Sequence, residues 1–248
     1  GGINMITANR VPATSDSRQV EQIIEALNIF VGVGNVCEIR ALGVDGRKGR
    51  TDAGYFDNFE MAARAVLSIR DAKGIYFCMN AVNPALLARA ANRIQQYAEL
   101  TTSDKDIIRR RWLLVDCDPV RPSGISSSDN ELNAALARAN DVIDWMMTQG
   151  FNEPILAKSG NGAHVQFPVD LPNDDESTTL VKSILQAVDA KFTDASVGID
   201  TGVYNAARIC RLYGTIARKG DSIPSRPHRL SELLYVPGYL KGESSNDA

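Results

Sequence analysis

The sequence predicts an α+β protein whose central sheet is built in the order β-α-β-β-α-β. Three observations support this class. Apolar residues recur at helical spacing in several segments, short apolar or alternating runs have the pattern of strands, and clusters of glycine, proline, asparagine and serine separate them. The order is that of a split β-α-β sheet with both helices on one face. A chain of 248 residues is long enough to bury such a core.

The first half of the chain predicts an N-terminal α/β unit, residues 5–110. Helices are expected over residues 19–30 and 59–69, and strands over residues 35–44 and 74–79. The polar, glycine-bearing residues 45–54 indicate a turn and hence a hairpin after the first strand. Asp57 is the expected N-cap of the second helix, and Asn83 with Pro84 at the first helical position opens a further helix.

The second unit, residues 111–241, carries the split β-α-β order. Strands are expected over residues 112–117, 154–158, 163–169 and 208–216, and helices over residues 132–147 and 177–192. Ser128 or Asp129, with Glu131 nearby, can cap the first of these helices. The unit is therefore expected to form an RRM-like sheet. Residues 242–248 are polar and are expected to be a disordered tail.

Composition narrows the function classes. A formal net charge of −3 argues against a protein that holds nucleic acid mainly through bulk positive charge, so any such contact must be local. No apolar run approaches the roughly 20 residues that span a bilayer, and the N-terminus lacks the pattern of a secretory signal. A cytoplasmic protein without membrane contact is expected. The cysteines lack the spacing of a zinc site and are expected to be small buried hydrophobes: Cys37, Cys78, Cys117 and Cys210.

Carboxylates stand out at two places in the second half. Asp116 and Asp118 are two residues apart at the end of a predicted strand, so their side chains emerge on the same face. Such a pair repels unless a cation or hydrogen-bond donors compensate it, and Mg²⁺ or Mn²⁺ prefers oxygen ligands of this kind. The alternative is a strand-end pair that only caps the turn before Pro119. Asp200 lies in a glycine-flanked turn after a helix, and taken alone it is an ordinary turn residue.

A glycine-rich turn, residues 159–164 (SGNGAH), joins two predicted strands. The glycines allow backbone N–H groups to approach an anion closely, and Ser159 and His164 supply side-chain donors beside them. A tight hairpin with a surface histidine is the alternative. The other histidine, His228, lies in a proline-flanked loop and is interpreted as a surface residue.

Cations gather downstream in an otherwise acidic chain, over residues 205–215 (NAARICRLYGT) and at Arg218 and Lys219. Arg208 and Arg211 interrupt an apolar segment, where an unpaired charge would be costly. A solvated basic face is a sufficient explanation of Arg218.

Taken together, the succession DCD, SGNGAH and an isolated aspartate before NAARICRLYGT resembles motifs I, II and III of the archaeo-eukaryotic primase superfamily. The likeness is to its primase-polymerase branch, found on phages, plasmids and mobile elements. Residues 74–93 also resemble the strand-and-helix unit before motif I, so the likeness covers about two thirds of the chain. The family fold is an N-terminal α/β unit packed on an RRM-like unit, with the active site between them.

The resemblance implies a DNA-directed primase-polymerase, which transfers nucleotides from (d)NTPs to a 3′-hydroxyl on a single-stranded or primed DNA template. It implies a two-metal site for Mg²⁺ or Mn²⁺ held by Asp116, Asp118 and Asp200. The nucleotide-binding set that it implies is Ser159, Gly160, Asn161, Gly162, His164, Asn205, Arg208, Arg211 and Lys219. A helicase or another replication factor is a further partner that the family suggests.

Two other classes stay open. A metal-dependent nuclease or phosphohydrolase could use the same carboxylates, but it would need no triphosphate cradle. A non-catalytic RRM-like module would bind nucleic acid without metal, and paired aromatic residues on the central strands would favour it. Residues 112–115 (WLLV) do not show that pattern. Some relatives carry a zinc-binding module, a helical bundle or a fused helicase, and this length leaves no room for them. We therefore expect nucleotide polymerisation rather than efficient unaided primer initiation.

Overall fold

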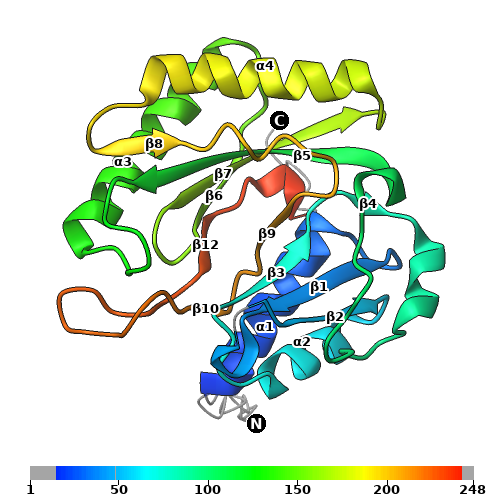
Figure 1. Cartoon of the computed structure of the whole chain (residues 1–248). Helices are drawn as coiled ribbons and strands as arrows, with labels where there is room; N and C mark the ends of the chain where they lie inside the picture. Colours follow the sequence, from blue (N-terminus) through cyan, green and yellow to red (C-terminus); the bar gives the residue numbers. More distant parts are fainter. Residues whose placement is uncertain (1–14, 48, 242–248) are drawn as a thin grey trace, which may run out of the picture.

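Two β-sheets face each other, and each is backed by two helices on its outer side (Figure 1). The computed structural model describes residues 15–47 and 49–241, so the tail predicted at residues 242–248 lies outside it. The N-terminal sheet has the strand order β2-β1-β3-β9. Its elements are α1 (Ser15–Phe30), β1 (Cys37–Leu42), β2 (Thr51–Phe56), α2 (Phe59–Ser68), β3 (Gly74–Cys78) and β9 (Ile209–Arg211).

The C-terminal sheet has the strand order β12-β6-β7-β5-β4, and a further strand, β8, pairs with the carboxyl end of β5. Its elements are β4 (Ala81–Val82), β5 (Ile107–Pro119), α3 (Asp129–Thr148), β6 (Ile155–Lys158), β7 (Ala163–Leu171), α4 (Asp175–Phe192), β8 (Val197–Ile199) and β12 (Glu232–Tyr235). A small hairpin, β10 (Ile216–Ala217) and β11 (Arg229–Leu230), and four 3₁₀ turns complete the fold: η1 (Val44–Gly46), η2 (Pro84–Arg89), η3 (Asp104–Asp106) and η4 (Gly238–Leu240).

The predicted α+β class and RRM-like sheet are confirmed. The elements β5-α3-β6-β7-α4-β8 place their strands in the spatial order β6-β7-β5-β8, which is the split β-α-β arrangement. At 13 residues, β5 is long enough to pair with β4 along its first half and with β8 at its carboxyl end. The central strand therefore reaches from one end of the molecule to the other (Figure 1).

The prediction that residues 208–216 form the last strand of this sheet is wrong. The sheet ends with β8, and residues 209–211 form β9, which pairs with β3 in the opposite sheet. The three residues of β8 are too few to show an alternating pattern. The apolar run near residue 210 predicts a strand, but it does not predict which strand it pairs with. The chain thus returns to the N-terminal sheet after β8, and the division at residue 110 stays a prediction.

Other local expectations are corrected in detail. Asn58, not Asp57, caps α2 by accepting from the Met61 N–H at 3.0 Å, because the Asp57 carboxylate instead accepts from Asn92. Residues 51–54 of the predicted turn belong to β2, which pairs with β1. The helix opened by Asn83 is only the 3₁₀ turn η2.

Ser128 caps α3 as predicted, in a reciprocal capping box with Glu131.

A continuous hydrophobic core joins the two halves at the end of α1. The Phe30 ring lies 5.4 Å from Phe77, 4.7 Å from Trp112 and 5.6 Å from Tyr213, measured between ring centres, so it contacts strands of both sheets. Removing a buried aromatic ring of this kind costs about 3–5 kcal/mol. This cluster therefore fixes how the sheets face each other.

The expectation for the cysteines is confirmed, since all of them are buried and unbridged, and burial raises the pKa of their thiols. Within residues 15–47 and 49–241, no helix combines the length and apolar character needed to cross a bilayer.

Candidate active site

A cavity of about 600 Å³ lies between the two sheets. The C-terminal sheet contributes carboxylates to its lining, while the N-terminal sheet and two loops contribute cations. Among the predicted site residues, those that line it are Asp116, Asp118, Ser159, Asn161, His164, Asp200, Arg208, Arg211 and Lys219. Those that do not are Gly160, Gly162 and Asn205.

The three aspartates meet because two neighbouring strands end together. Asp116 and Asp118 lie on the face of β5 that lines the cavity, whereas Cys117 between them is fully buried. β8 runs beside this end of β5, and the N–H of Asp200 donates to the carbonyl of Asp116 at 3.0 Å. Side-chain alternation and strand pairing thus place all three carboxylates on the cavity wall, which is called the acidic wall below.

Each aspartate has a basic side chain within 4 Å of its carboxylate. The distances are 3.6 Å from Asp116 Oδ1 to His164 Nε2, 3.6 Å from Asp118 Oδ1 to Arg121 Nη1, and 3.9 Å from Asp200 Oδ2 to Arg208 Nη2. These separations exceed a charge-assisted hydrogen bond, which is about 2.7–2.9 Å. The acidic wall is therefore compensated electrostatically, but its carboxylates keep oxygen atoms that a further cation could bind.

Charge repulsion is visible in the pKa values of the pair. Burial raises the pKa of Asp116, but its interactions with His164 and with Arg208 and Arg121 outweigh burial and hold that pKa below the ordinary value. Burial and the neighbouring charge of Asp116 raise the pKa of Asp118 instead. The folded structure thus favours the ionised form of Asp116 and disfavours the ionised form of Asp118.

The acidic wall fits a divalent metal ion by its chemistry. Within the part of the chain that the structure describes, no three acidic, histidine or cysteine side chains already form a metal-binding group. However, Asp116 Oδ1 is buried and has no hydrogen-bond partner among these residues. An orphaned carboxylate oxygen beside a repelling carboxylate suits a hard cation such as Mg²⁺ or Mn²⁺. Asp116, Asp118 and Asp200 are the residues that would hold it.

The SGNG turn is a tight hairpin between β6 and β7, and its polar groups mainly hold it in place. Ser159 Oγ accepts from the Gly162 N–H at 3.1 Å, and Asn161 Oδ1 accepts from the Ser127 N–H at 2.9 Å. A Cβ atom at Gly160 would lie 2.4 Å from Ala217 Cβ, and one at Gly162 would lie 2.5 Å from the carbonyl oxygen of residue 117. Both glycines therefore serve close packing around the acidic wall.

His164 is not the surface residue of the alternative interpretation, because only 5% of it is exposed. Its Nδ1 lies 2.9 Å from the Tyr213 hydroxyl, whose pKa burial raises well above its usual value. Gln166 Nε2 donates to the same hydroxyl oxygen at 3.4 Å, so the hydroxyl hydrogen is free to donate to Nδ1. Nε2 lies on the other side of the ring, 3.6 Å from Asp116 Oδ1 at the cavity. His228 is partly exposed and lies outside the cavity lining, as predicted.

The opposite wall is basic. Arg211 of β9 and Tyr76 of β3 come from the N-terminal sheet, and Lys73 precedes β3. The N–H of Arg218 donates to the carbonyl of Lys73 at 3.0 Å, so these two cations lie together. The basic wall below means Lys73, Tyr76, Arg211, Arg218 and Lys219. No sequence pattern marks Lys73 or Tyr76 as site residues, because they line the cavity through the packing of segments that are distant in the chain.

Two loops form the rim beside the basic wall. Residues 119–128 carry Arg121 and residues 218–230 carry Lys219, and we name the two together the clasp. Ser126 Oγ donates to the carbonyl of Lys219 at 3.1 Å, and a Cβ atom at Gly220 would lie 2.6 Å from the carbonyl oxygen of residue 124. The two segments therefore cross in direct contact.

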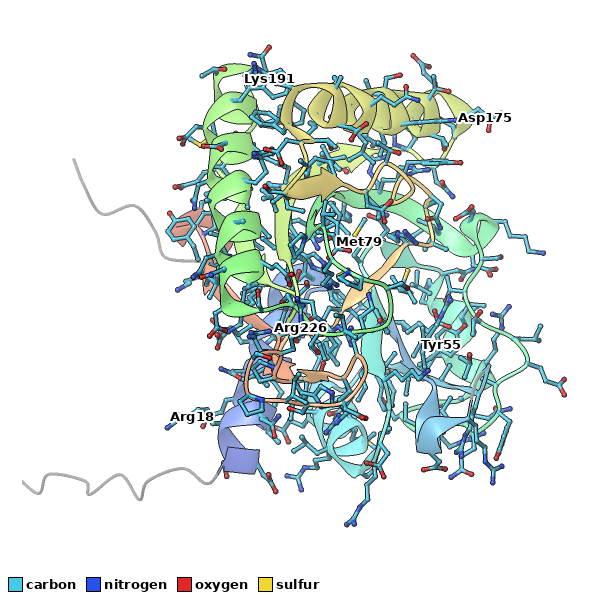
Figure 2. All side chains as sticks on the ribbon, turned by 60° about the vertical axis from the view of Figure 1, so that its left-hand side comes forward. Arg18, Tyr55, Met79, Asp175, Lys191 and Arg226 are labelled. Atoms are coloured by element: carbon cyan, nitrogen blue, oxygen red, sulfur yellow. The ribbon has the colours of Figure 1, made fainter. Side chains whose placement is uncertain are left out.

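An ion pair fastens the clasp to α3. Both Nη atoms of Arg226 donate to the Glu131 carboxylate, at 2.7 and 2.8 Å, and hold the pKa of Glu131 at about 2. Figure 2 shows Arg226, a residue of the second clasp loop, at one end of α3. Sequence reasoning missed the clasp because its loops lie about 100 residues apart and have no regular pattern.

Asn205 is one of the predicted residues outside the cavity lining. Its Nδ2 donates to Asp104 Oδ1 at 3.3 Å, which holds it on the η3 turn rather than at the cavity. A role in nucleotide binding stays a prediction for this residue.

The fold and the cavity define a protein in which an acidic wall lies opposite a basic wall. No family model and no curated protein matches the chain. Among solved structures it is similar to the primase RepB′, at 12% identity and a TM-score of 0.44, over 91% of this chain and 62% of that one. It is also similar to the polymerase domain of Mycobacterium tuberculosis Ligase D in complex with DNA, at 14% identity and a TM-score of 0.42, over 86% and 87%.

The chain thus spans less than two thirds of the RepB′ chain. One neighbour is a primase and the other a polymerase domain, the two activities that the motif resemblance implies. At these identities and TM-scores, any conclusion about activity depends on the residues of the cavity itself.

Proposed function

We propose that the chain is a metal-dependent nucleotidyltransferase of the primase-polymerase type, which extends a nucleic-acid 3′-hydroxyl from a nucleoside triphosphate on a DNA template. The observation that carries this proposal is the pairing of an acidic and a basic wall in one cavity of about 600 Å³. A magnesium–triphosphate complex presents cationic and anionic groups at once, and such a ligand can engage both walls.

The acidic wall would hold divalent ions through Asp116, Asp118 and Asp200. Bound there, Mg²⁺ or Mn²⁺ would lower the pKa of the attacking hydroxyl and neutralise charge on the phosphates. The repulsion that raises the pKa of Asp118 supports this role, since a cation between the carboxylates relieves it.

The basic wall and the turn would position the triphosphate. Lys219 and Arg211 would bind its oxygens, and Ser159, which accepts from Gly162, keeps its own hydroxyl hydrogen for a phosphate oxygen. His164 Nε2 lies on the same side. In the reaction, the 3′-oxygen forms a bond to the α-phosphorus while its proton leaves, and the α–β anhydride bond breaks to release pyrophosphate. The contribution of these side chains is alignment and charge stabilisation.

The same geometry disfavours the other two classes. A nuclease or phosphohydrolase could use the acidic wall, but it would need no triphosphate cradle of the kind that the basic wall and the SGNG turn offer. A non-catalytic RRM-like module would expose aromatic rings on β5 and β7, whereas this face of β5 carries Asp116 and Asp118.

The test is a primer-extension and de novo priming assay with all eight nucleotides, a DNA template, and Mg²⁺ or Mn²⁺. Template-directed extension that stops when the metal is chelated is the expected result. Shortening of the primer without extension would replace the proposal by a nuclease. Metal-independent binding of template with no synthesis would replace it by a binding module.

A further inference from the structure

Two tyrosines outside the cavity are exposed to nearly the same extent but have opposite surroundings. The exposed fractions are 51% for Tyr97 and 52% for Tyr239. The Tyr239 hydroxyl donates to the carbonyl oxygen of Glu153, and burial together with the charge of Glu153 raises the pKa of Tyr239. Tyr97 instead lies between two arginines, since Arg50 faces its ring and Arg47 donates to its hydroxyl. Tyr97 is thus an exposed ring in basic surroundings.

The Tyr97 ring is fixed from beneath. The guanidinium carbon of Arg50 lies over the ring, 4.3 Å from its centre. Two hydrogen bonds of 2.9 and 2.8 Å hold this guanidinium on the Asp52 carboxylate, and only 7% of the Arg50 side chain is exposed. The face of the ring that is turned away from Arg50 is therefore the one that solvent reaches.

The backbone of Tyr97 is strained. Its φ is +51°, in the left-handed region that bulky side chains rarely adopt. Such a conformation persists only where the surrounding structure fixes it, and it is frequent at ligand sites. Here Asp52 Oδ1 accepts from the Tyr97 N–H at 3.0 Å, while Arg50 fixes the ring. The ring is thus held in one orientation before any ligand binds.

Arg47 adds an uncompensated cation at the edge of this ring. Its Nη1 donates to the Tyr97 hydroxyl at 2.6 Å, and the residue is exposed. Asp45 and Asp52 neutralise Arg50, whereas no ion pair within residues 15–47 and 49–241 includes Arg47. Its other N–H groups are available to a phosphate. An open aromatic face beside such a cation is the combination that binds single-stranded nucleic acid, with the base on the ring and the phosphate on the cation.

A row of hydrogen-bonded segments joins Tyr97 to the cavity. The Ala98 N–H donates to the Thr51 carbonyl at 2.8 Å, and Thr51 pairs with Leu42 in the sheet. The Lys73 N–H donates to the Leu42 carbonyl at 3.0 Å, and both of these residues line the cavity. Two strand spacings of about 4.8 Å separate the backbones of Ala98 and Leu42 by roughly 10 Å. A single strand that leaves the cavity past Leu42 along this end of the sheet therefore reaches Tyr97.

We propose that Tyr97, with Arg47 beside it, is a stacking platform for a base of the unpaired template strand, just outside the cavity. This inference rests on the proposed function, which makes a DNA template the ligand. Only an unpaired strand offers free base faces, and an aromatic ring stacks on any base, so the contact is tolerant of sequence. A protein with a net charge of −3 depends on such local contacts to hold nucleic acid.

The first test measures binding of a single-stranded oligonucleotide by fluorescence anisotropy, without nucleotide or metal. Tyr97→Leu keeps an apolar cover over Arg50 but removes the stacking face. It is expected to weaken binding about 5- to 150-fold, the value of one stacked base. Tyr97→Phe, which keeps the ring, should bind at least about 5-fold more tightly than Tyr97→Leu. Tyr239→Leu is the matched control, because it removes an equally exposed ring, and it should bind like the parent.

An oligonucleotide of the same length without bases separates stacking from a structural effect. The parent should bind it at least about 5-fold more weakly than the base-bearing strand, and Tyr97→Leu should bind it as the parent does.

The salt dependence of binding tests Arg47. Arg47→Gln should reduce the slope of log affinity against log salt concentration by roughly 0.7, the value of one phosphate contact of a single strand. Arg64→Gln removes an equally exposed charge from α2 and should leave the slope unchanged. An unchanged slope for Arg47→Gln would remove the phosphate contact from the platform.

Two results would overturn the platform. One is parent-like binding by Tyr97→Leu. The other is an equal loss of affinity for the base-bearing and the base-free strand, which would mean that the ring only shields the pair of Arg50 with Asp52. If circular dichroism shows that Tyr97→Leu is unfolded, the parent carries the test, and equal affinity for the two strands overturns the platform.

Failure of the proposed function gives a different result. A parent protein that prefers the base-bearing strand but extends no primer would keep the platform and overturn the polymerase. Primer extension by the parent, with no loss of binding in Tyr97→Leu, would overturn the platform alone.

Discussion

The two walls of the cavity are built by different means. The acidic wall comes from the ends of two paired strands, β5 and β8, so side-chain alternation and one strand pairing are enough to bring its carboxylates together. The basic wall combines β9, the segment before β3 and the clasp, which meet only after the whole chain has folded. Local residue spacing thus determines where the carboxylates lie, whereas the packing of distant segments determines where the cations lie. Variants that affect one wall should differ from variants that affect the other.

The largest effect is expected from the acidic wall. Asp116→Ala combined with Asp118→Ala should reduce primer extension by a factor on the order of 10³ or more, because under the proposed function this wall would hold the metal ions. The fold should survive, since the change removes two repelling carboxylates. Primer extension and thermal unfolding measure the two effects. Undiminished extension by the double variant would contradict the metal assignment.

His164 lies beside the acidic wall, between Asp116 on one side and the buried Tyr213 hydroxyl on the other. His164→Ala should weaken binding of a non-hydrolysable triphosphate about 10- to 150-fold, the value of one charge-assisted hydrogen bond. Template binding should change little, since it involves other surfaces. Paired titrations with nucleotide and with template test this expectation. Equal nucleotide affinity in variant and parent would mean that the SGNGAH segment is only a hairpin and does not bind the nucleotide.

A smaller effect is expected from the clasp, which only positions cations of the basic wall. Glu131→Gln should weaken nucleotide binding about 3- to 10-fold, the range of a partly exposed ion pair. The control is Asp194→Asn, which breaks a pair with Arg138 outside the cavity. It should leave nucleotide affinity at the parent value, and a loss equal to that of Glu131→Gln would contradict a positioning role.

The clasp also predicts a pH dependence. Because the pKa of Glu131 is lowered from 4.5 to about 2 in the folded protein, its contribution to stability is present above the unfolded value and is lost as pH falls towards about 2. The difference in melting temperature between parent and Glu131→Gln should therefore be constant near neutrality and shrink below about pH 4.5. A difference that grows towards acid would contradict the ion pair with Arg226.

The smallest effect concerns Asp118 without metal. Its raised pKa means that ionisation disfavours the folded state, so its stabilising contribution is present only below the unfolded pKa and is lost as pH rises through the folded pKa. Asp118→Asn should raise the melting temperature at neutral pH by less than roughly 4 °C, because half of the side chain is exposed to solvent. The gain should vanish in acid. Calorimetry in chelator measures it, and a lower melting temperature at neutral pH would refute the repulsion.

The same contrast explains what the sequence could predict. The spacing of Asp116 and Asp118, and the Ser128 cap of α3, are local features, and a single strand or helix end determines them. Arg121 is local as well, three residues after Asp118, but the clasp that surrounds it is not. Asn161 lines the cavity, and its Oδ1 accepts from the Ser127 N–H, a contact that no local pattern encodes; its role in nucleotide binding stays a prediction.

The misplaced strand has the same cause. Residues 209–211 have the apolar pattern of a strand, and pattern alone places them beside their neighbours in sequence. Their actual partner, β3, precedes them by more than a hundred residues. Lys73 and Tyr76 were missed for this reason, since they become part of the cavity only when β3 and β9 pair.

The pairing of β3 with β9 has a consequence for how the protein matures. The Tyr76–Arg211 contact closes a loop of 135 residues. Closing a long loop slows folding, because the chain loses conformational entropy before the contact forms and offsets that loss. During synthesis on the ribosome, the segments for β3 and β5 emerge well before β9. A nascent chain can therefore form the strand that carries Asp116 and Asp118 before it has a mature cavity. The cavity is therefore completed only after β9 has emerged and paired with β3.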